Sequence, residues 1–149
     1  MKFDQRLTVR APKEAVDRVL ADVPRVASFV PGVEDVKPLG GDDYEGKVRV
    51  SLGPMSFRFA GKGEVLRDAA AGTWRLKAHA KDARIGGGVD ATIAVQVIAV
   101  DASTTDLAID ADVTMLGRIG DMGQPIMRRK AKSMIAEFGK RLQAAATAG

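Results

Sequence analysis

Few side chains in this sequence are able to perform covalent or acid–base chemistry. The sequence contains no cysteine, which excludes a disulfide, a thiolate metal ligand and a cysteine nucleophile. His79 is the one histidine, which is too little for a zinc site or a histidine-based triad. Two other residues could contact a ligand. Tyr44, the one tyrosine, could orient a carbonyl group, and Lys130 falls within a predicted apolar helix face.

Tyr44 and Lys130 also have purely structural interpretations. Tyr44 could be a core aromatic residue whose hydroxyl reaches the rim of the core. Lys130 could lay its aliphatic stem on the core and extend its ammonium group into water. As a functional residue, Lys130 would instead be a single polar anchor for a carbonyl or acidic group in an apolar pocket. The sequence leaves these alternatives open.

Most other charged groups are predicted to face solvent. His79 alternates with cations along its strand, and three aspartates share the outer side of the last predicted strand. The cations are Arg75, Lys77 and Lys81, and the aspartates are Asp106, Asp110 and Asp112. A strand follows Gly86-Gly87-Gly88, so this segment is predicted to be a hairpin turn and not a phosphate-binding loop. The inward polar positions are then Gln5, Tyr44 and Lys130, which favours a binding protein over an enzyme.

The net charge of +4 is concentrated near the C-terminus. Between Arg118 and Leu142 there are seven cations and two anions, so this segment carries +5 and the rest of the chain −1. Four cations are predicted to share the polar face of a helix: Arg118, Arg128, Arg129 and Lys132. This face is either solvated surface or a contact with an anionic membrane or an acidic partner. Nucleic acid is not expected, because no aromatic residues lie between the cations.

The elements that position these residues follow from hydrophobic periodicity. Residues 2–10 and six segments between 33 and 115 alternate apolar and polar residues, which predicts seven antiparallel strands with one wet face. Two short helices are predicted after the first strand, beginning near Pro12 and Pro24. From Gly117 onward the spacing predicts one amphipathic helix of about 25 residues, with Pro125 in its first turns. Residues 144–149 are predicted to be a frayed tail.

The length and composition limit the number of domains, the fold class and the cellular compartment that we expect. The 149 residues, 46% hydrophobic and 28% charged, predict a single α+β domain over 1–149. No stretch approaches the ~20 apolar residues of a membrane-spanning helix, and the first residues lack the apolar core of a signal peptide. We therefore expect a cytoplasmic protein that is at most peripheral at the inner membrane surface.

Two features of the inward-facing positions favour a hollow between the sheet and the long helix. Many inward strand residues are small: Gly46, Gly61, Gly63, Ala78, Ala80, Ala91 and Ala111. The last strand and the helix are rich in methionine, which adapts to varied apolar shapes: Met115, Met122, Met127 and Met134. The alternative is a core that is simply packed with flexible side chains.

Several short motifs, in this order, resemble one known family. They are Ala11-Pro12 with Val16, Val19, Leu20 and Asp22; Pro31-Gly32-Val33; Tyr44 with Gly46-Lys47-Val48; Gly53-Pro54 with Phe59 and Gly61; Gly87-Gly88; and Gly117 through Phe138. Together they resemble the CoxG family of carbon monoxide dehydrogenase subunits, within the START-like, polyketide-cyclase-like (SRPBCC) superfamily. Asp17 departs from the pattern, because many superfamily members carry an aromatic residue on the first helix.

The resemblance implies a helix-grip fold, in which a curved seven-stranded antiparallel sheet wraps around a long C-terminal helix. It also implies an apolar cavity between them. The residues expected to line it are Tyr44, Met55, Phe57, Phe59, Trp74, Leu76, Ile93, Leu107, Ile109, Met115, Met122, Ile126, Met127, Lys130, Met134 and Phe138. Pro31-Gly32 and Gly53-Pro54 are expected in loops at the cavity mouth. A metal site is not expected, and the one small molecule expected is a bound quinone or similar lipid.

Three hypotheses for function follow. The first is a non-enzymatic protein that holds a lipophilic ligand and helps a molybdenum-containing carbon monoxide dehydrogenase or related hydroxylase reach the membrane. The second is a cyclase or hydrolase like other members of the superfamily, which would need more inward polar groups than Gln5, Tyr44 and Lys130. The third is an assembly factor for the dehydrogenase that binds no ligand. The sequence favours the first and does not separate it from the third.

Overall fold

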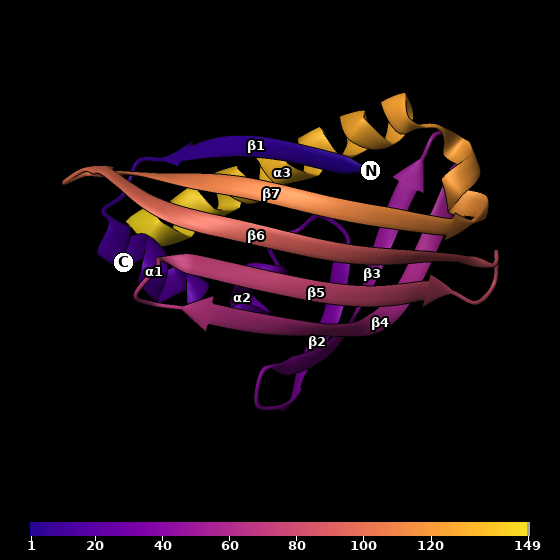
Figure 1. Cartoon of the computed structure of the whole chain (residues 1–149), viewed down its shortest axis with the longest axis horizontal. Helices are drawn as coiled ribbons and strands as arrows, with labels where there is room; N and C mark the ends of the chain where they lie inside the picture. Colours follow the sequence, from indigo (N-terminus) through magenta and orange to yellow (C-terminus); the bar gives the residue numbers. More distant parts are fainter. Residues whose placement is uncertain (149) are drawn as a thin grey trace.

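Seven antiparallel strands form one sheet in the order β1-β7-β6-β5-β4-β3-β2 in the computed structural model, which describes residues 1–148 (Figure 1). The strands are β1 (Lys2–Val9), β2 (Val33–Gly40), β3 (Asp43–Leu52), β4 (Met55–Asp68), β5 (Thr73–Asp82), β6 (Gly87–Asp101) and β7 (Thr104–Gly117). The helices are α1 (Lys13–Leu20), α2 (Val23–Ala27), the 3-10 helix η1 (Arg118–Met122) and α3 (Gln124–Thr147). The predicted α+β helix-grip architecture is confirmed.

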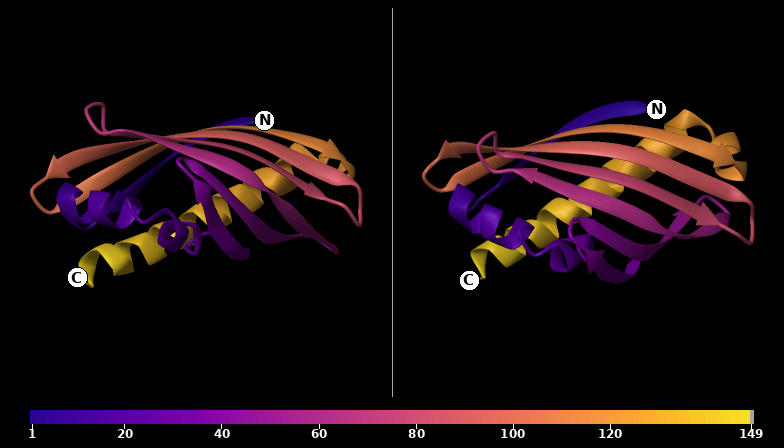
Figure 2. Two further views of the ribbon diagram at one scale, coloured as in Figure 1. Left: turned by 90° about the horizontal axis from the view of Figure 1, so that it is seen from below. Right: turned by 60° about the horizontal axis from the view of Figure 1, so that its bottom comes forward.

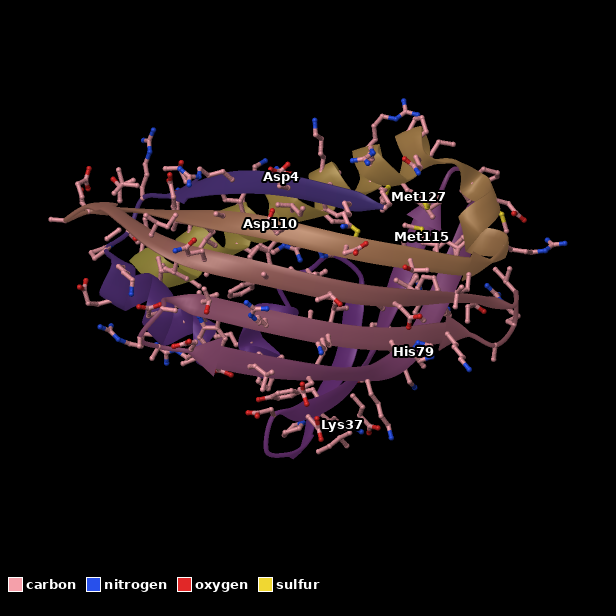
Figure 3. The ribbon with its side chains drawn as sticks, in the orientation of Figure 1. Asp4, Lys37, His79, Asp110, Met115 and Met127 are labelled. Atoms are coloured by element: carbon pink, nitrogen blue, oxygen red, sulfur yellow. The ribbon has the colours of Figure 1, made fainter. Side chains whose placement is uncertain are left out.

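The strands have the alternating burial that their sequences predict. Along β1, Leu7 and Val9 point toward the helices, whereas Arg6 and Thr8 are exposed. The sheet arches over α3, so we call the side that α3 covers the concave face and the opposite side the outer face (Figure 2). His79 and Asp110 lie on the outer face, as predicted from their alternation (Figure 3).

The start of the long helix differs from the prediction. Strand β7 continues to Gly117, and residues 118–122 form the separate 3-10 helix η1. Gly123 separates η1 from α3. Its φ of +83° is a conformation that glycine adopts without a Cβ clash. Pro125 lies in the first turn of α3. Its fixed φ is helical, and a backbone N–H at this position would have no acceptor within the helix, so proline costs no hydrogen bond. The predicted single helix from Gly117 was therefore wrong for residues 117–123.

The predicted frayed tail is also corrected for residues 144–147, which remain helical. Leu142 is fully buried and Ala146 is 9% exposed, because this end of α3 packs in the same apolar cluster as α1. Small alanine side chains permit that close approach of two helices. Gly149 lies outside the described residues.

Helix α3 runs alongside the edge strand β1. At one end the Arg128 guanidinium donates to the Lys2 carbonyl oxygen at 3.0 Å. At the other end the Gln143 Oε1 accepts from the Arg10 backbone N–H at 3.0 Å. A seven-stranded sheet is about 29 Å wide, whereas a helix with its side chains is about 10 Å wide. One helix therefore cannot cover the whole concave face.

The buried apolar residues form two separate clusters. The first cluster joins β1, α1, β6, β7 and the C-terminal part of α3, and contains Val9, Ala11, Val16, Val19, Leu20, Val97, Leu107, Ile109, Leu142 and Ala146. The second cluster joins the β3–β4 hairpin to η1, and contains Leu52, Phe57, Phe59 and Ile119. Partly buried residues such as Ile126 of α3 pack against the second cluster. The helix is thus held against the sheet by its C-terminal half, from Ile135 onward, and by its first turn.

Asp82 stabilises the place where β4 leaves β5. A Cβ at Gly61 would overlap the β5 backbone, so only glycine allows this close approach of the two strands. Beyond Ala60, β4 has no β5 partner, and the Asp82 carboxylate accepts from the Arg58 N–H at 2.7 Å. The same carboxylate accepts from the Arg84 and Ile85 N–H groups at 2.9 Å and 3.0 Å. Asp82 is 2% exposed, and its bonds replace the missing strand pairing.

No helix in the described part of the chain, residues 1–148, has an apolar stretch long enough to cross a bilayer.

We expect Asp82→Asn to lower the midpoint of thermal unfolding by several degrees at pH 7, because the new amide directs a donor at one of the N–H groups. The N–H groups of Ile85, Arg58 and Arg84 hold the pKa of Asp82 below its ordinary value of 3.8, against the effect of burial. The stabilisation is therefore complete above pH 3.8 and is lost as pH falls through the lower folded-state pKa. The wild-type midpoint should fall more steeply than that of Asp82→Asn below about pH 4. Asp110→Asn, on the exposed outer face, is the control; equal midpoints for the two variants at pH 7 would contradict the role of Asp82.

Candidate functional site

The candidate site is the part of the concave face that lies between the two clusters. Its apolar residues are half-buried and belong to neither cluster nor its packed neighbours. We call these residues the central strip: Tyr44, Leu76, Ala78, Ala91 and Val113 from the sheet, and Lys130, Ala131 and Met134 from α3. In the folded chain they form a partly accessible apolar surface, and such surfaces commonly bind ligands or partners.

Strand register joins the small inward residues into one continuous patch. Tyr44 pairs with Gly63, Gly63 with Ala78, Ala78 with Ala91, and Ala91 with Val113, across five neighbouring strands. A second row alongside it contains Gly46, Gly61 and Ala80. These small side chains fill little of the volume between the sheet and α3.

Three inward polar side chains lie on the concave side: Tyr44 and Lys130 in the central strip, and Gln5 in the row of Ile109, which belongs to the first cluster. Gln5 and Tyr44 are half-buried inward residues of β1 and β3. Lys130 is half-buried on α3, between Ile126, which packs on the second cluster, and Phe138, whose ring centroid is 6.3 Å from that of Phe29. Within residues 1–148 none of the three side chains has a hydrogen-bond or ion-pair partner. Each is therefore free to bond a polar group of a ligand.

The residues predicted to line a cavity divide into three sets. Tyr44, Leu76, Lys130 and Met134 belong to the central strip. Met55, Trp74, Ile93, Met115, Met122, Ile126 and Phe138 are half-buried at the edges of the clusters. Phe57, Phe59, Leu107, Ile109 and Met127 are buried and present little or no surface to a ligand. Figure 3 labels Met115 on β7 and Met127 near the start of α3.

Two hollows of the described residues 1–148 lie away from the space between sheet and α3, where a cavity stays a prediction. A hollow of about 530 Å³ and another of about 420 Å³ both lie on the outer face of the sheet. Neither lies between the sheet and α3. The central strip is half-exposed, and α3, which follows the β1 edge, covers only part of the concave face.

Both predicted mouth loops adjoin β3. The Gly32 carbonyl accepts from the Arg49 N–H at 2.9 Å. At φ +86°, a Cβ at Gly32 would overlap the Arg49 carbonyl oxygen, so this close contact requires glycine. Gly53 and Pro54 form the exposed turn between β3 and β4. Their role at the entrance to a ligand site stays a prediction.

The predicted basic surface is present but is not a single helix face. Arg128, Arg129 and Lys132 are exposed on α3. Arg118 is exposed on η1. Because Gly123 separates η1 from α3, Arg118 does not share a helix face with the three cations of α3. We call the three α3 residues the basic surface.

One structural residue escaped the sequence reasoning. Every second residue of β5 from Trp74 onward points inward, and Asp82 is the last of them. This alternation could have identified Asp82 as an inward carboxylate. The extent of the central strip had no comparable signal, because it depends on the pairing of strands far apart in sequence.

Comparison with known proteins agrees with this architecture. A crystal structure of a conserved protein from Geobacillus kaustophilus has a TM-score of 0.90 at 17% identity, covering 99% of this chain and 96% of that one. A START superfamily protein from Mycobacterium smegmatis has a TM-score of 0.72 at 14% identity, covering 97% and 96%. The ZhuI aromatase/cyclase from Streptomyces sp. R1128 has a TM-score of 0.69 at 18% identity, covering 98% and 93%. At these identities the likeness establishes the fold alone.

No match was found among curated proteins. The sequence profile of CoxG, described as a subunit of carbon monoxide dehydrogenase, matches residues 6–147, which is nearly the whole chain. The chain therefore belongs to the CoxG family.

Proposed function

We propose that this protein is a non-catalytic carrier of a lipophilic ligand, an isoprenoid quinone or a similar lipid, which binds against the central strip. The observation that carries the proposal is the division of the core into two clusters with half-buried apolar residues between them. An apolar chain laid along this strip would bury surface that now faces water. The small residues Gly63, Ala78 and Ala91 leave room for it.

Two donors at the strip, the Tyr44 hydroxyl and the Lys130 ammonium, suit a ligand with carbonyl oxygens, because each can donate a hydrogen bond to a carbonyl. Gln5 lies on β1, far across the sheet from Tyr44 on β3, and could only meet a different part of a long ligand. A quinone ring combines two carbonyl groups with an apolar tail, which matches this combination of donors and apolar surface. Binding and orientation are what these residues supply.

We further propose that the protein is an accessory factor that recruits a molybdenum-containing carbon monoxide dehydrogenase-like enzyme to the membrane. The family to which the chain belongs supports this partner. The basic surface, Arg128, Arg129 and Lys132, would attract anionic lipid on the cytoplasmic side of the membrane. A carrier at this position could link the dehydrogenase to quinone in the bilayer.

Filling the central strip should weaken ligand binding. Ala91→Phe places a large ring beside Ala78 and Val113, and we expect it to raise the Kd for a short-chain isoprenoid quinone at least about tenfold. Trp74 is the single tryptophan and is half-buried on the concave face, so quenching of its fluorescence reports binding. Ala60→Phe, on the exposed outer face, is the matched control. Equal affinities for both variants and the wild type, or no quenching by quinone, would reject the proposed site.

Lys130 should contribute to the affinity for a ligand with carbonyl or acidic groups. Lys130→Met keeps the apolar stem and removes the ammonium, so we expect about a fivefold to tenfold higher Kd with an unchanged midpoint of thermal unfolding. Lys132→Met removes an exposed ammonium from the same helix and should leave the Kd unchanged. An unchanged Kd in Lys130→Met would show that Lys130 only extends from the core into water.

The basic surface should govern membrane binding. We expect Arg129→Glu/Lys132→Glu to reduce binding to phosphatidylcholine vesicles with about 30% phosphatidylglycerol by about tenfold or more, measured by co-sedimentation. Arg128 is left intact because it bonds to the Lys2 carbonyl. Lys47→Glu/Lys81→Glu makes the same change in charge on the outer face and should retain binding. Equal losses in both variants would mean that net charge, and not this surface, drives the attraction.

A further inference from the structure

The outer face of the sheet has an uncharged stretch of β6, from Thr92 to Gln96, between two oppositely charged strands; Asp90, the next outward residue of β6, pairs with His79. Along the middle of β6 the outward residues are Thr92, Ala94 and Gln96. On one side, β7 presents Asp110 and Asp112; on the other side, β5 presents Arg75 and Lys77. Figure 3 looks onto this face, with Asp4 and Asp110 on neighbouring strands.

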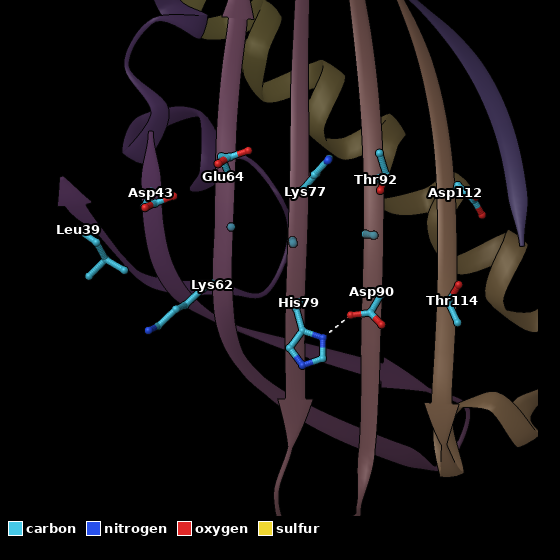
Figure 4. Close-up of a pocket in the computed structure, with 13 residues that line it drawn as sticks. Leu39, Asp43, Lys62, Glu64, Lys77, His79, Asp90, Thr92, Asp112 and Thr114 are labelled. Atoms are coloured by element: carbon cyan, nitrogen blue, oxygen red, sulfur yellow. Dashed lines mark hydrogen bonds and ion pairs between the residues drawn. The ribbon is translucent and has the colours of Figure 1, made fainter. Parts of the chain in front are cut away.

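The charges reverse sign across β6, row by row. In the row centred on Thr92 the order from β1 to β4 is Lys2, Asp112, Thr92, Lys77, Glu64. Its signs are plus, minus, neutral, plus and minus, so each charge has its opposite at the same distance on the other side of β6. Figure 4 shows most of this row, from Glu64 to Asp112.

Two further rows follow this rule in part or in full. In the row centred on Ala94, Asp110 of β7 is matched by Arg75 of β5, whereas Asp4 of β1 is matched by the uncharged Leu66 of β4. In the row centred on Gln96, Arg6 of β1 is matched by Asp68 of β4.

These charges are not neutralised within the chain. Among residues 1–148, none of Asp110, Asp112, Arg75 and Lys77 has an ion-pair partner within 4.0 Å. Asp4 and Asp110 lie directly opposite one another on β1 and β7, an arrangement of like charges that destabilises a sheet. By contrast, His79 pairs with Asp90 in the next row (Figure 4). The unpaired charges would gain most from an outside surface of complementary pattern.

The same region is hollowed enough to receive side chains from a partner. The hollow of about 530 Å³ is bordered by Lys77, Thr92 and Asp112, and the one of about 420 Å³ by Asp110, Thr92 and Asp112. Both therefore meet at Thr92 and Asp112, beside the central strand.

We propose that this face binds a second copy of the same chain, with a two-fold axis that runs along β6. Rotation about that axis brings β7 of one copy over β5 of the other and keeps each row opposite itself. Asp112 then faces Lys77 of the second copy, Asp110 faces Arg75, and Lys2 faces Glu64, each pair occurring twice. A two-fold axis perpendicular to the strands would instead place β7 over β7 and β5 over β5, with like charges opposed.

The resulting dimer is weak and sensitive to salt, because its pairs are charged and solvent-exposed. It leaves the concave face and the basic surface of both copies uncovered. The inference therefore does not depend on the proposed ligand or on the proposed partner.

Sedimentation velocity of complementary charge variants tests the proposal. The wild type should have twice the monomer mass in about 20 mM salt and the monomer mass in about 500 mM salt. Asp110→Lys/Asp112→Lys and Arg75→Asp/Lys77→Asp should each be monomeric in low salt. Mixing the two variants should restore a one-to-one dimer, because one then has an all-basic and the other an all-acidic patch. Arg129→Asp/Lys132→Asp, on α3, should dimerise like the wild type.

A second measurement does not require the charge variants to fold. The chain has no cysteine, so Thr92→Cys places a single thiol on the proposed axis. A bis-maleimide about 10 Å long, the usual spacing of packed sheets, should join two copies in low salt and not in high salt. Ala136→Cys, on the exposed side of α3, should not cross-link. A monomer at low salt, a dimer that the face variants leave unchanged, or equal cross-linking at both cysteines would each overturn the proposal.

Discussion

The width of the sheet relative to its one long helix is the constraint on which the rest of this structure depends. Seven strands span about 29 Å, and α3 covers about a third of that width. The helix follows the β1 edge, where Arg128 and Gln143 bond to the strand backbone. Elsewhere the concave face is closed at one end by α1 and at the other by the β3–β4 hairpin with η1. The uncovered remainder is the central strip.

This arrangement separates stability from binding. The residues that hold the fold together, such as Leu107, Leu142 and Phe57, are fully buried in one cluster or the other. The residues available to a ligand, such as Tyr44, Leu76 and Met134, belong to neither cluster. Occupation of the strip would join two cores that the protein alone keeps apart, and would thereby also stabilise the fold. The outer face and the basic surface remain free for contacts with macromolecules.

Most of the architecture could be predicted because local patterns encode it. Alternation along β1 and β3–β7 identified the strands and the faces of their side chains, including the outward placement of His79 and Asp110. The start of the helix could not be predicted from its apolar arc, since on the 3-10 helix η1 Ile119 is buried and Met122 half-buried, so both keep the inward placement that the arc indicated. The helical state of residues 144–147 was missed because Ala146 is buried by contact with a distant element, α1.

By itself the sequence determined the fold class, the family and the general character of each face, because periodicity, turn residues and motif order are local properties. Only the tertiary structure decided which inward residues remain accessible. Phe59 and Leu76 both occupy inward strand positions, yet one is packed in the second cluster and the other is half-exposed between clusters. The row from Tyr44 to Val113 and the charge reversal across β6 arise from strand register. Register joins residues far apart in the chain, so it is fixed by packing of the whole sheet and not by any one segment.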